Sequence, residues 1–168
     1  KIVLATGAVT TFAGQSSSGN VNDVGTNAQF NYPYLIDISS DGSYALVTDF
    51  SNSAIRKIII TSQVVTTYAS SLSAPDGLTI SRDMSYALTT FGGGKIKKVI
   101  ISTAAVSDYV GHTGAPTYLD GDGTSAGFAF PFGISLSPTG RSALVCDAAN
   151  HNIRKIQILT PPVHLYLR

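Results

Sequence analysis

The sequence has only one cysteine and few charged side chains. The single Cys146 excludes an intrachain disulfide and any metal site that needs paired cysteines. It stands in the apolar run 143–147, which predicts a buried position in a strand. Charged residues make up 12% of the chain, against about 25% in ordinary soluble domains. So little charge is typical of a chain that neighbours cover extensively, or of a protein outside the cytosol.

The sequence also lacks an excess of one charge and a long apolar run. Eleven basic and ten acidic residues give a net charge of +1, which supplies no field to attract nucleic acid or an anionic membrane. No apolar run approaches the length of about 18 residues that a membrane-spanning helix needs. We therefore expect no nucleic-acid partner and no membrane insertion. The chain begins at Lys1 with no initiator Met and no leader, so we expect a processed or excised piece.

What the sequence does have is a long internal repeat. Phe30–Ile58 returns as Phe128–Ile156, and the aligned residues are 98 positions apart without a gap. The shared positions include a proline, an aspartate and an Arg-Lys pair. A weaker third copy covers Leu72–Val99. Repeats with a period of about 20 to 50 residues are typical of solenoids and propellers.

A second repeated pattern consists of two short β-branched runs. It begins at Lys1, Lys57 and Lys98, and a few small or polar residues separate the two runs. This pattern predicts a hairpin at each place. Segments rich in Gly, Ser, Asn and Asp lie between residues 13 and 31 and between residues 110 and 129, and they predict loops.

The order of these runs predicts an all-β protein. Four short strands per unit, each bounded by turn residues, are typical of four-stranded antiparallel sheets, and no helical periodicity is present. Such units stack as blades in a β-propeller, where each blade buries its face on the next. A continuous β-sandwich is the alternative, but sandwiches do not repeat their loops in register. Within a propeller segment at 1–158, we expect part of a blade at 1–12, blades at 34–70 and 76–111, and part of a blade at 132–158, followed by a tail or linker at 159–168.

The repeated residues resemble the NHL repeat. The resemblance rests on the string Gly-Thr-x-Ala-x-Phe-x-x-Pro, an apolar strand, a turn, an apolar run that ends in Asp, and Asn-x-Ile-Arg-Lys-Ile. It is strongest in Gly25–Ile58 and Gly123–Ile156, whereas the middle unit has Thr90 and Phe91 where its neighbours have the Asp. The resemblance implies a propeller, typically of about six blades, in which the strand after the proline lines the central channel.

The resemblance also implies a ring that this chain does not close. Only two of the expected blades are complete, and propellers need at least about four blades. We therefore expect a fragment of a longer protein, with the assembly of several copies into one ring as the alternative. The implied partners are the remaining blades of the same protein or other protein chains.

Two pairs of repeated charged residues are candidates for contact with a partner. Asp49 and Asp147 each close the second strand of a unit, where a carboxylate commonly accepts hydrogen bonds from turn amides. Arg56 and Arg154 are expected to lie across the neighbouring blade. Contact with a ligand at one end of the propeller is the alternative for all four residues.

Aromatic residues around two of the prolines are the second candidate for partner contact. They alternate from the loop into the channel strand, so that one face packs inward while the other is presented at the surface of the ring. Core packing is the alternative. The aromatic run contains Phe30 and Phe128, and the residues expected to contact a partner are Tyr32, Tyr34, Phe130 and Phe132.

Few residues indicate metal or catalytic chemistry. Asp120 and Asp122 alternate with glycine, a pattern that can wrap oxygen ligands around calcium, but the loop lacks the bidentate Glu of a helix-loop-helix site. The histidines His112, His151 and His164 are expected in a loop, a turn and the tail, and none on a channel strand. No Ser-His-Asp order stands out. We predict no catalytic residue and no cofactor.

These observations favour a non-catalytic binding or scaffold module in a larger extracellular or cell-surface assembly, with a protein or a carbohydrate as partner. The alternative is a fragment of a propeller enzyme of the lyase or lactonase type, whose metal ligands stand on blades outside this chain. RNA binding, known among NHL propellers, is the third hypothesis. The net charge of +1 disfavours RNA binding.

Overall fold

The computed structural model describes residues 2–3, 6–112 and 118–158. These residues form β-strands joined by turns, loops and short 3₁₀ helices. The strands make a two-stranded, a three-stranded and two four-stranded antiparallel sheets. The prediction of an all-β fold with propeller-type blades of four antiparallel strands is confirmed. Among the described residues no helix is both long and apolar enough to cross a membrane. The expected tail or linker at 159–168 lies outside the described residues.

Three of the sheets are blades that follow one another along the chain. The two-stranded sheet precedes them and contains β1 (Ile2–Val3) and β2 (Ala8–Val9). The first blade contains β3 (Pro33–Ile38), β4 (Tyr44–Asp49), β5 (Ala54–Ile59) and β6 (Val65–Ala69). The middle blade contains β7 (Pro75–Ile80), β8 (Tyr86–Phe91), β9 (Lys95–Ile100) and β10 (Val106–Val110). The last blade contains β11 (Pro131–Leu136), β12 (Ser142–Asp147) and β13 (Asn152–Gln157). The 3₁₀ helices are η1 (Gly25–Asn27), η2 (Phe50–Asn52), η3 (Gly123–Ser125) and η4 (Ala148–Asn150).

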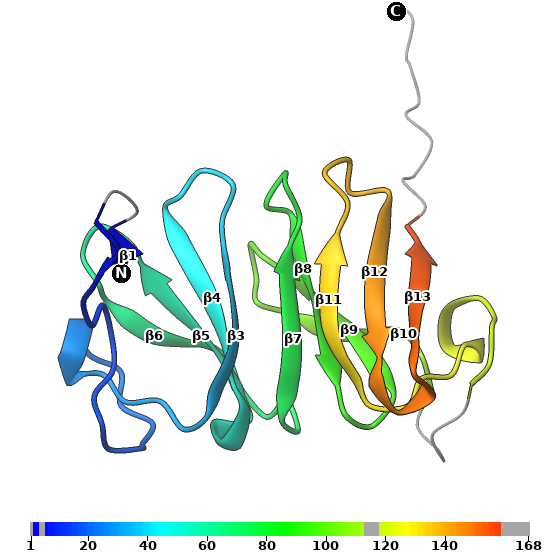
Figure 1. Ribbon diagram of the computed structural model, residues 1–168, viewed down its shortest axis with the longest axis horizontal. Coiled ribbons are helices and arrows are strands. Elements are labelled where there is room, and N and C mark those ends of the chain that lie inside the picture. The colour runs from blue at the N-terminus through cyan, green and yellow to red at the C-terminus, as the bar shows by residue number, and fades with distance from the viewer. Residues whose placement is uncertain (1, 4–5, 113–117, 159–168) are drawn as a thin grey trace, which may run out of the picture.

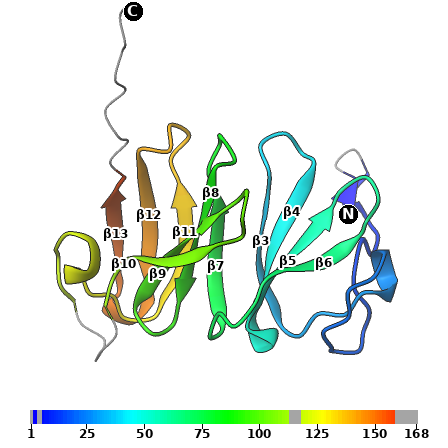
Figure 2. The ribbon, with the colours of Figure 1, turned by 180° about the vertical axis from the view of Figure 1, so that it is seen from behind.

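Figure 1 shows the three blades side by side in chain order, and Figure 2 shows the same array from behind. The first strands of the blades are neighbours, because β7 packs against β3 on one side and against β11 on the other. This arrangement is that of the strands that surround the channel of a propeller. The turns that join the first strand of each blade to the second lie along the upper edge in Figure 1.

Each first strand begins with a proline at the opposite edge. In every blade this proline pairs with the last residue of the second strand, and the register shifts directly afterwards. The pairs are Pro33 with Asp49, Pro75 with Phe91 and Pro131 with Asp147. Proline has no N–H to give to a ladder, so the first position of a strand suits it. We call this end of the three strands the proline edge.

Two clusters of buried apolar side chains hold the blades together. Leu46 of the first blade packs in one cluster with Leu78 of the middle blade. Leu88 of the middle blade packs in the other cluster with Val145 of the last blade. Each blade therefore buries one apolar face on the first and second strands of the next blade, as stacked repeats do.

The equivalent face of the last blade is exposed in the described residues. Leu144 and Ile153 are 53% and 64% exposed, whereas Leu46 and Ile55, which hold the same positions in the first blade, are 0% exposed. Cys146 stands two residues after Leu144 on the same strand and is also exposed. The prediction of a buried cysteine is therefore wrong, because an apolar run does not reveal which face of a sheet is covered.

Candidate functional site

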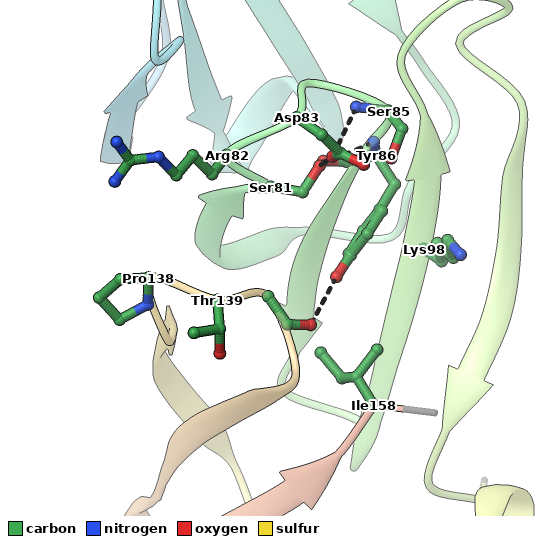
Figure 3. Close-up of a pocket in the computed structure, with 10 residues that line it drawn as sticks. Ser81, Arg82, Asp83, Ser85, Tyr86, Lys98, Pro138, Thr139 and Ile158 are labelled. Atoms are coloured by element: carbon green, nitrogen blue, oxygen red, sulfur yellow. Dashed lines mark hydrogen bonds between the residues drawn. The ribbon is translucent and has the colours of Figure 1, made fainter. Parts of the chain in front are cut away.

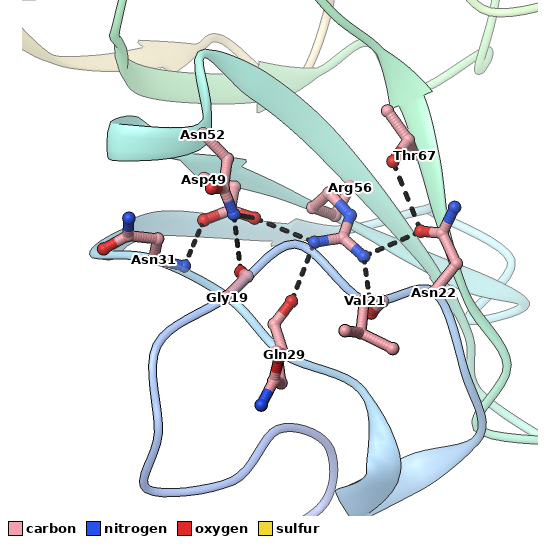
Figure 4. A network of polar contacts seen from close by, with 9 residues as sticks. All are labelled: Gly19, Val21, Asn22, Gln29, Asn31, Asp49, Asn52, Arg56 and Thr67. Carbon is pink, nitrogen blue, oxygen red and sulfur yellow. Dashed lines mark hydrogen bonds and ion pairs between the residues drawn. The ribbon is translucent and has the colours of Figure 1, made fainter.

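A buried ion pair joins Asp49 at the end of β4 to Arg56 in β5 (Figure 4). The distance from Arg56 Nη1 to Asp49 Oδ2 is 2.9 Å, and both residues are 0% exposed. The other carboxylate oxygen, Oδ1, accepts the backbone N–H of Asn31 at 2.7 Å. The side-chain amide of Asn52 donates to Asp49 Oδ2 at 2.8 Å. Both oxygens of this carboxylate are therefore bonded inside the blade.

The remaining contacts of Arg56 bind the loop that precedes the first blade (Figure 4). Its guanidinium donates to the carbonyl oxygens of Gln29 and Val21 and to Asn22 Oδ1, at distances between 2.7 and 3.0 Å. Charge-assisted bonds of this kind are the stronger ones in proteins. Arg56 thus fixes the loop to its own blade, and the expected position across a neighbouring blade is wrong.

The last blade repeats this network around Asp147 and Arg154. Arg154 Nη1 lies 3.1 Å from Asp147 Oδ2, and Asp147 Oδ1 accepts the N–H of Ala129 at 2.7 Å. Arg154 Nη2 lies 2.6 Å from Asp120 Oδ1, which takes the place of the Asn22 oxygen in the first blade. Asp147 is 0% exposed and Arg154 is 9% exposed.

The prediction that Asp49, Arg56, Asp147 and Arg154 contact a partner is therefore wrong. All four residues are buried, and their charged groups are bonded to each other and to the adjacent loop. Both carboxylates do accept backbone amides, as expected of an aspartate that ends a strand. Burial of a charge is tolerated here because each charge is paired and hydrogen-bonded.

Asp120 and Asp122, the calcium candidates, lie in the loop before η3 and at its start. The Arg154 guanidinium contacts Oδ1 of Asp120, whose side chain is 83% exposed. Over residues 2–3, 6–112 and 118–158, no three His, Cys, Asp or Glu side chains are close enough together to hold a metal ion. His112 and His151 are among the residues searched, whereas His164 lies outside them.

The aromatic residues of the proline edge are exposed. The exposed fractions are 67% for Tyr32, 44% for Tyr34, 52% for Phe130 and 44% for Phe132. Phe30 is partly buried, and Phe128 is 4% exposed within the core. Of these six aromatic side chains, four are therefore exposed and two pack inward.

Two residues with positive φ explain this division. Tyr32 has φ +54° and Phe130 has φ +51°. A residue in the left-handed region interrupts the extended backbone, so side chains before and after it no longer alternate regularly. The simple alternation expected from the sequence would have placed Phe30, Tyr32 and Tyr34 on one face.

The exposed rings also contact neighbouring elements. Tyr34 stacks on Phe50 of η2, with ring centroids 4.6 Å apart. Phe130 lies over the middle blade at Gly92, where an added Cβ would come within 3.5 Å of its ring. These contacts hold Tyr34 and Phe130 in place at the proline edge, a useful property for residues that anchor a partner.

The sequence reasoning missed Asp76, which lies in the same row. The residue after the proline of each first strand is Tyr34, Asp76 or Phe132. Because the first strands are neighbours, a carboxyl group stands between two aromatic positions. Aligning the middle unit with the other two would have revealed this substitution of Asp for an aromatic residue.

Asp76 is a buried acid without a cationic partner among the described residues. It is 2% exposed, and its Oδ1 atom is buried with no hydrogen-bond partner. Burial raises the pKa of its carboxyl group to about 6, against the opposing effect of a hydrogen bond from the Gly92 N–H. Acids with a raised pKa gather at functional sites, although structural positions also produce them.

The opposite edge carries a cleft between the middle and last blades (Figure 3). It has a volume of about 490 Å³ and lies between the turn that contains Asp83 and the turn that contains Gly140. Asp83 accepts the hydroxyl of Ser81 at 2.7 Å, and this bond is the main reason that its pKa is lowered. The hydroxyl of Tyr86 makes a long bond of 3.5 Å to the Gly140 carbonyl. Asp83 and Tyr86 thus stabilise the turns. The cleft is therefore a weaker candidate for a binding site than the proline edge.

Comparisons with known proteins support the fold but do not establish a function. No protein-family model and no curated protein matches this chain. A Bacteroides thetaiotaomicron structural genomics protein of unknown function is similar in structure, with TM-score 0.64 and 16% identity over 90% of this chain and 35% of its own. An auxiliary nutrient binding protein from Bacteroides ovatus has TM-score 0.65 and 15% identity over 79% of this chain and 38% of its own.

A third structure, Kuenenia stuttgartiensis hydrazine synthase, has TM-score 0.53 and 18% identity over 76% of this chain and 36% of its own. The chain thus spans little more than a third of the length of these proteins. Their names cover a binding protein and an enzyme, so the shared fold does not separate the two functions. The resemblance to NHL repeats stays a prediction within a propeller-like fold.

Proposed function

We propose that the chain is part of a non-catalytic binding module that holds a protein partner at the proline edge. The observation that carries this proposal is the set of exposed aromatic side chains there, led by Tyr32 at 67% and Phe130 at 52%. Tyr and Phe are enriched at protein interfaces, where charged residues are depleted from the centre. The low charge of the chain, 12%, fits such a surface.

The larger assembly is proposed to be extracellular or on the cell surface, as the composition favours. An NHL-type propeller would supply further blades around the same channel, and the aromatic row would continue onto them. The similarity in fold to a nutrient-binding protein is compatible with a binding role. Enzymatic function is not part of this proposal.

Affinity capture tests the proposal with three forms of the chain. The first is the unchanged protein, and the second carries Tyr32→Ser with Phe130→Ser. The third carries Tyr118→Ser, which removes an aromatic ring that is 63% exposed on the loop before η3 and lies over Arg154, outside the set of four exposed rings. We expect the unchanged chain and the Tyr118 variant to capture a partner protein that the double variant does not capture. Mass spectrometry quantifies the captured proteins.

Thermal unfolding of all three forms serves as a control for folding, since substitution of exposed residues costs little stability. Retention of every captured protein by a folded double variant would contradict the proposal. Loss of the same proteins from the Tyr118 variant would also contradict it, because the effect would then not depend on the proline edge.

A further inference from the structure

In the middle blade, an acid and a glycine hold the two positions that an aromatic pair holds in the first blade. The ring of Tyr34 stacks on the ring of Phe50 in the first blade, with 23° between their planes. Tyr34 directly follows the proline of the first strand, and Phe50 directly follows the last residue of the second strand. The same two positions in the middle blade belong to Asp76 and Gly92. The flat ring of Phe50 therefore has no counterpart in the middle blade.

The space above Gly92 is bordered by the Asp76 carboxyl group and the ring of Phe130. A Cβ atom added at Gly92 would stand 3.7 Å from Asp76 Oδ2 and 3.5 Å from Phe130 Cδ1. Both distances are ordinary van der Waals separations. Gly92 is partly exposed and Gly93 beside it is exposed, so the place is open at the proline edge. A group one atom thick therefore fits against both the acid and the ring.

The carboxyl group of Asp76 has no positive neighbour among the described residues. Its Oδ1 atom is buried without a hydrogen-bond partner, and Lys95, which follows the glycines, contacts Asp108 instead. The other two buried acids of the proline edge, Asp49 and Asp147, are each paired with an arginine. A buried charge without a partner is costly, so a cation that binds there removes this cost.

We propose that an arginine side chain of the protein partner binds over Gly92, with its guanidinium against the Asp76 carboxylate and the Phe130 ring. This inference rests on the proposed binding of a protein at the proline edge, and it names the group that the edge recognises. A guanidinium is planar, like the Phe50 ring at the matching place of the first blade, and it always carries its charge. It donates strong hydrogen bonds to a carboxylate and is attracted to the face of an aromatic ring.

Peptide binding to the full chain tests the proposal. Two synthetic libraries of short peptides differ only at the central position, which is arginine in one and citrulline, its uncharged isostere, in the other. Peptides from the arginine library that bind the unchanged protein are made again in both forms, and fluorescence polarisation measures their affinities. We expect the arginine form to bind at least about tenfold more tightly than the citrulline form, because only the arginine form supplies a charge-assisted bond.

Three variants of the chain locate the arginine. Asp76→Asn keeps the shape of the side chain and removes its charge, so the preference for arginine over citrulline should disappear. Gly92→Leu places a side chain where the guanidinium binds, so it should weaken binding of the arginine peptides. Gly93→Leu is the matched control, because an added Cβ there meets no atom within 4 Å and neither glycine has a positive φ. It should bind like the unchanged protein, and thermal unfolding checks that every variant is folded.

Equal affinity for the arginine and citrulline forms would overturn the proposal, as would an arginine library without binders or an arginine preference that survives Asp76→Asn. The double variant Tyr32→Ser with Phe130→Ser separates this result from a failure of the proposed function. Peptides that lose affinity for the double variant but not for Asp76→Asn would leave binding at the proline edge in place and remove only the role of arginine. Peptides that bind every variant equally would contradict both proposals.

Discussion

The hydroxyl group of Thr90 donates a hydrogen bond of 2.7 Å to the carbonyl oxygen of Phe132, and so links the middle blade to the last. Thr48 makes the same bond, also of 2.7 Å, from the first blade to the carbonyl of Asp76. Both threonines stand one residue before the end of the second strand. In the last blade this position belongs to the exposed Cys146. The junction between blades therefore combines apolar packing with this repeated polar bond.

Replacing Thr90 with valine removes this bond while keeping the shape of the side chain. The hydroxyl group also accepts the N–H of Gly77 at 2.7 Å, so Thr90→Val removes the partner of a buried N–H and of a part-buried carbonyl. Each buried polar group left unpaired costs about 1–3 kcal/mol. We expect the free energy of unfolding, measured by urea titration, to fall by about 2 kcal/mol or more.

Thr89→Val is the matched control one residue earlier. Thr89 is 0% exposed and its hydroxyl has no partner among the described residues. Val47 and Val145 hold this position in the other blades. The same chemical change should therefore leave stability unchanged or raise it. Equal losses of unfolding free energy in the two variants would contradict a stabilising role for the hydrogen bond from Thr90.

The covered and uncovered faces of the blades give a second prediction. Leu46→Ala should lower the free energy of unfolding by about 2–5 kcal/mol, the usual cost of truncating a buried leucine. Leu144→Ala should change it by less than about 1 kcal/mol, because Leu144 is 53% exposed whereas Leu46 is 0% exposed. Urea unfolding of both variants measures the difference. A large loss for Leu144→Ala would mean that another chain covers the last blade in solution.

The buried ion pair of the first blade gives a third prediction. Asp49→Ala leaves the Arg56 guanidinium buried without its counter-charge, and the loss of one partner of such a pair costs about 3–5 kcal/mol. The loop bound to Arg56 should become more open to proteolysis. Asp122→Ala, at an exposed position, is the control and should leave both the unfolding curve and the digestion rate unchanged. Undiminished stability of Asp49→Ala would contradict the structural role of this pair.

The order of the strands could be predicted from the sequence because its signals are local. Turn residues bound each run, and the repeat aligns the runs of one unit with those of the next. The hairpins expected at Lys57 and Lys98 are present as β5 with β6 and β9 with β10. Each first strand begins at the proline itself, one residue before the expected start of the blade.

The candidate site was harder to predict from the sequence because its geometry depends on contacts between distant segments. The spacing of Asp49 and Arg56 predicts neither burial nor a loop that folds back onto them. The positive φ of Tyr32 interrupts the expected alternation of side chains, and nothing in the residue type signals this. Cys146 is exposed because a whole face is uncovered, which no local pattern reports. Asp76 was visible in the alignment but stood in the most divergent unit.

Asp76 makes the stability of the folded protein decrease as the pH rises. Its pKa is raised from 3.8 to about 6 in the folded protein. Between these two values the folded state binds more protons than the unfolded state, so stability falls as the pH rises through this window. The destabilising effect of this group is absent below about pH 4 and complete above about pH 6. Asp76→Asn cannot ionise and still offers an oxygen to the Gly92 N–H.

The stability gained by Asp76→Asn should therefore be small near pH 4, grow as the pH rises, and level off above about pH 6. Urea unfolding of both proteins between about pH 4 and pH 8 measures this difference. The pKa values of Asp41, Asp83 and Asp108 are lowered by hydrogen bonds. These groups favour the folded state at higher pH, which is the opposite sign, but they are the same in both proteins and cancel in the difference. A gain that shrinks with rising pH would instead mean that the Asp76 carboxylate is paired with a cation, and the buried acid would then stabilise the junction between the blades.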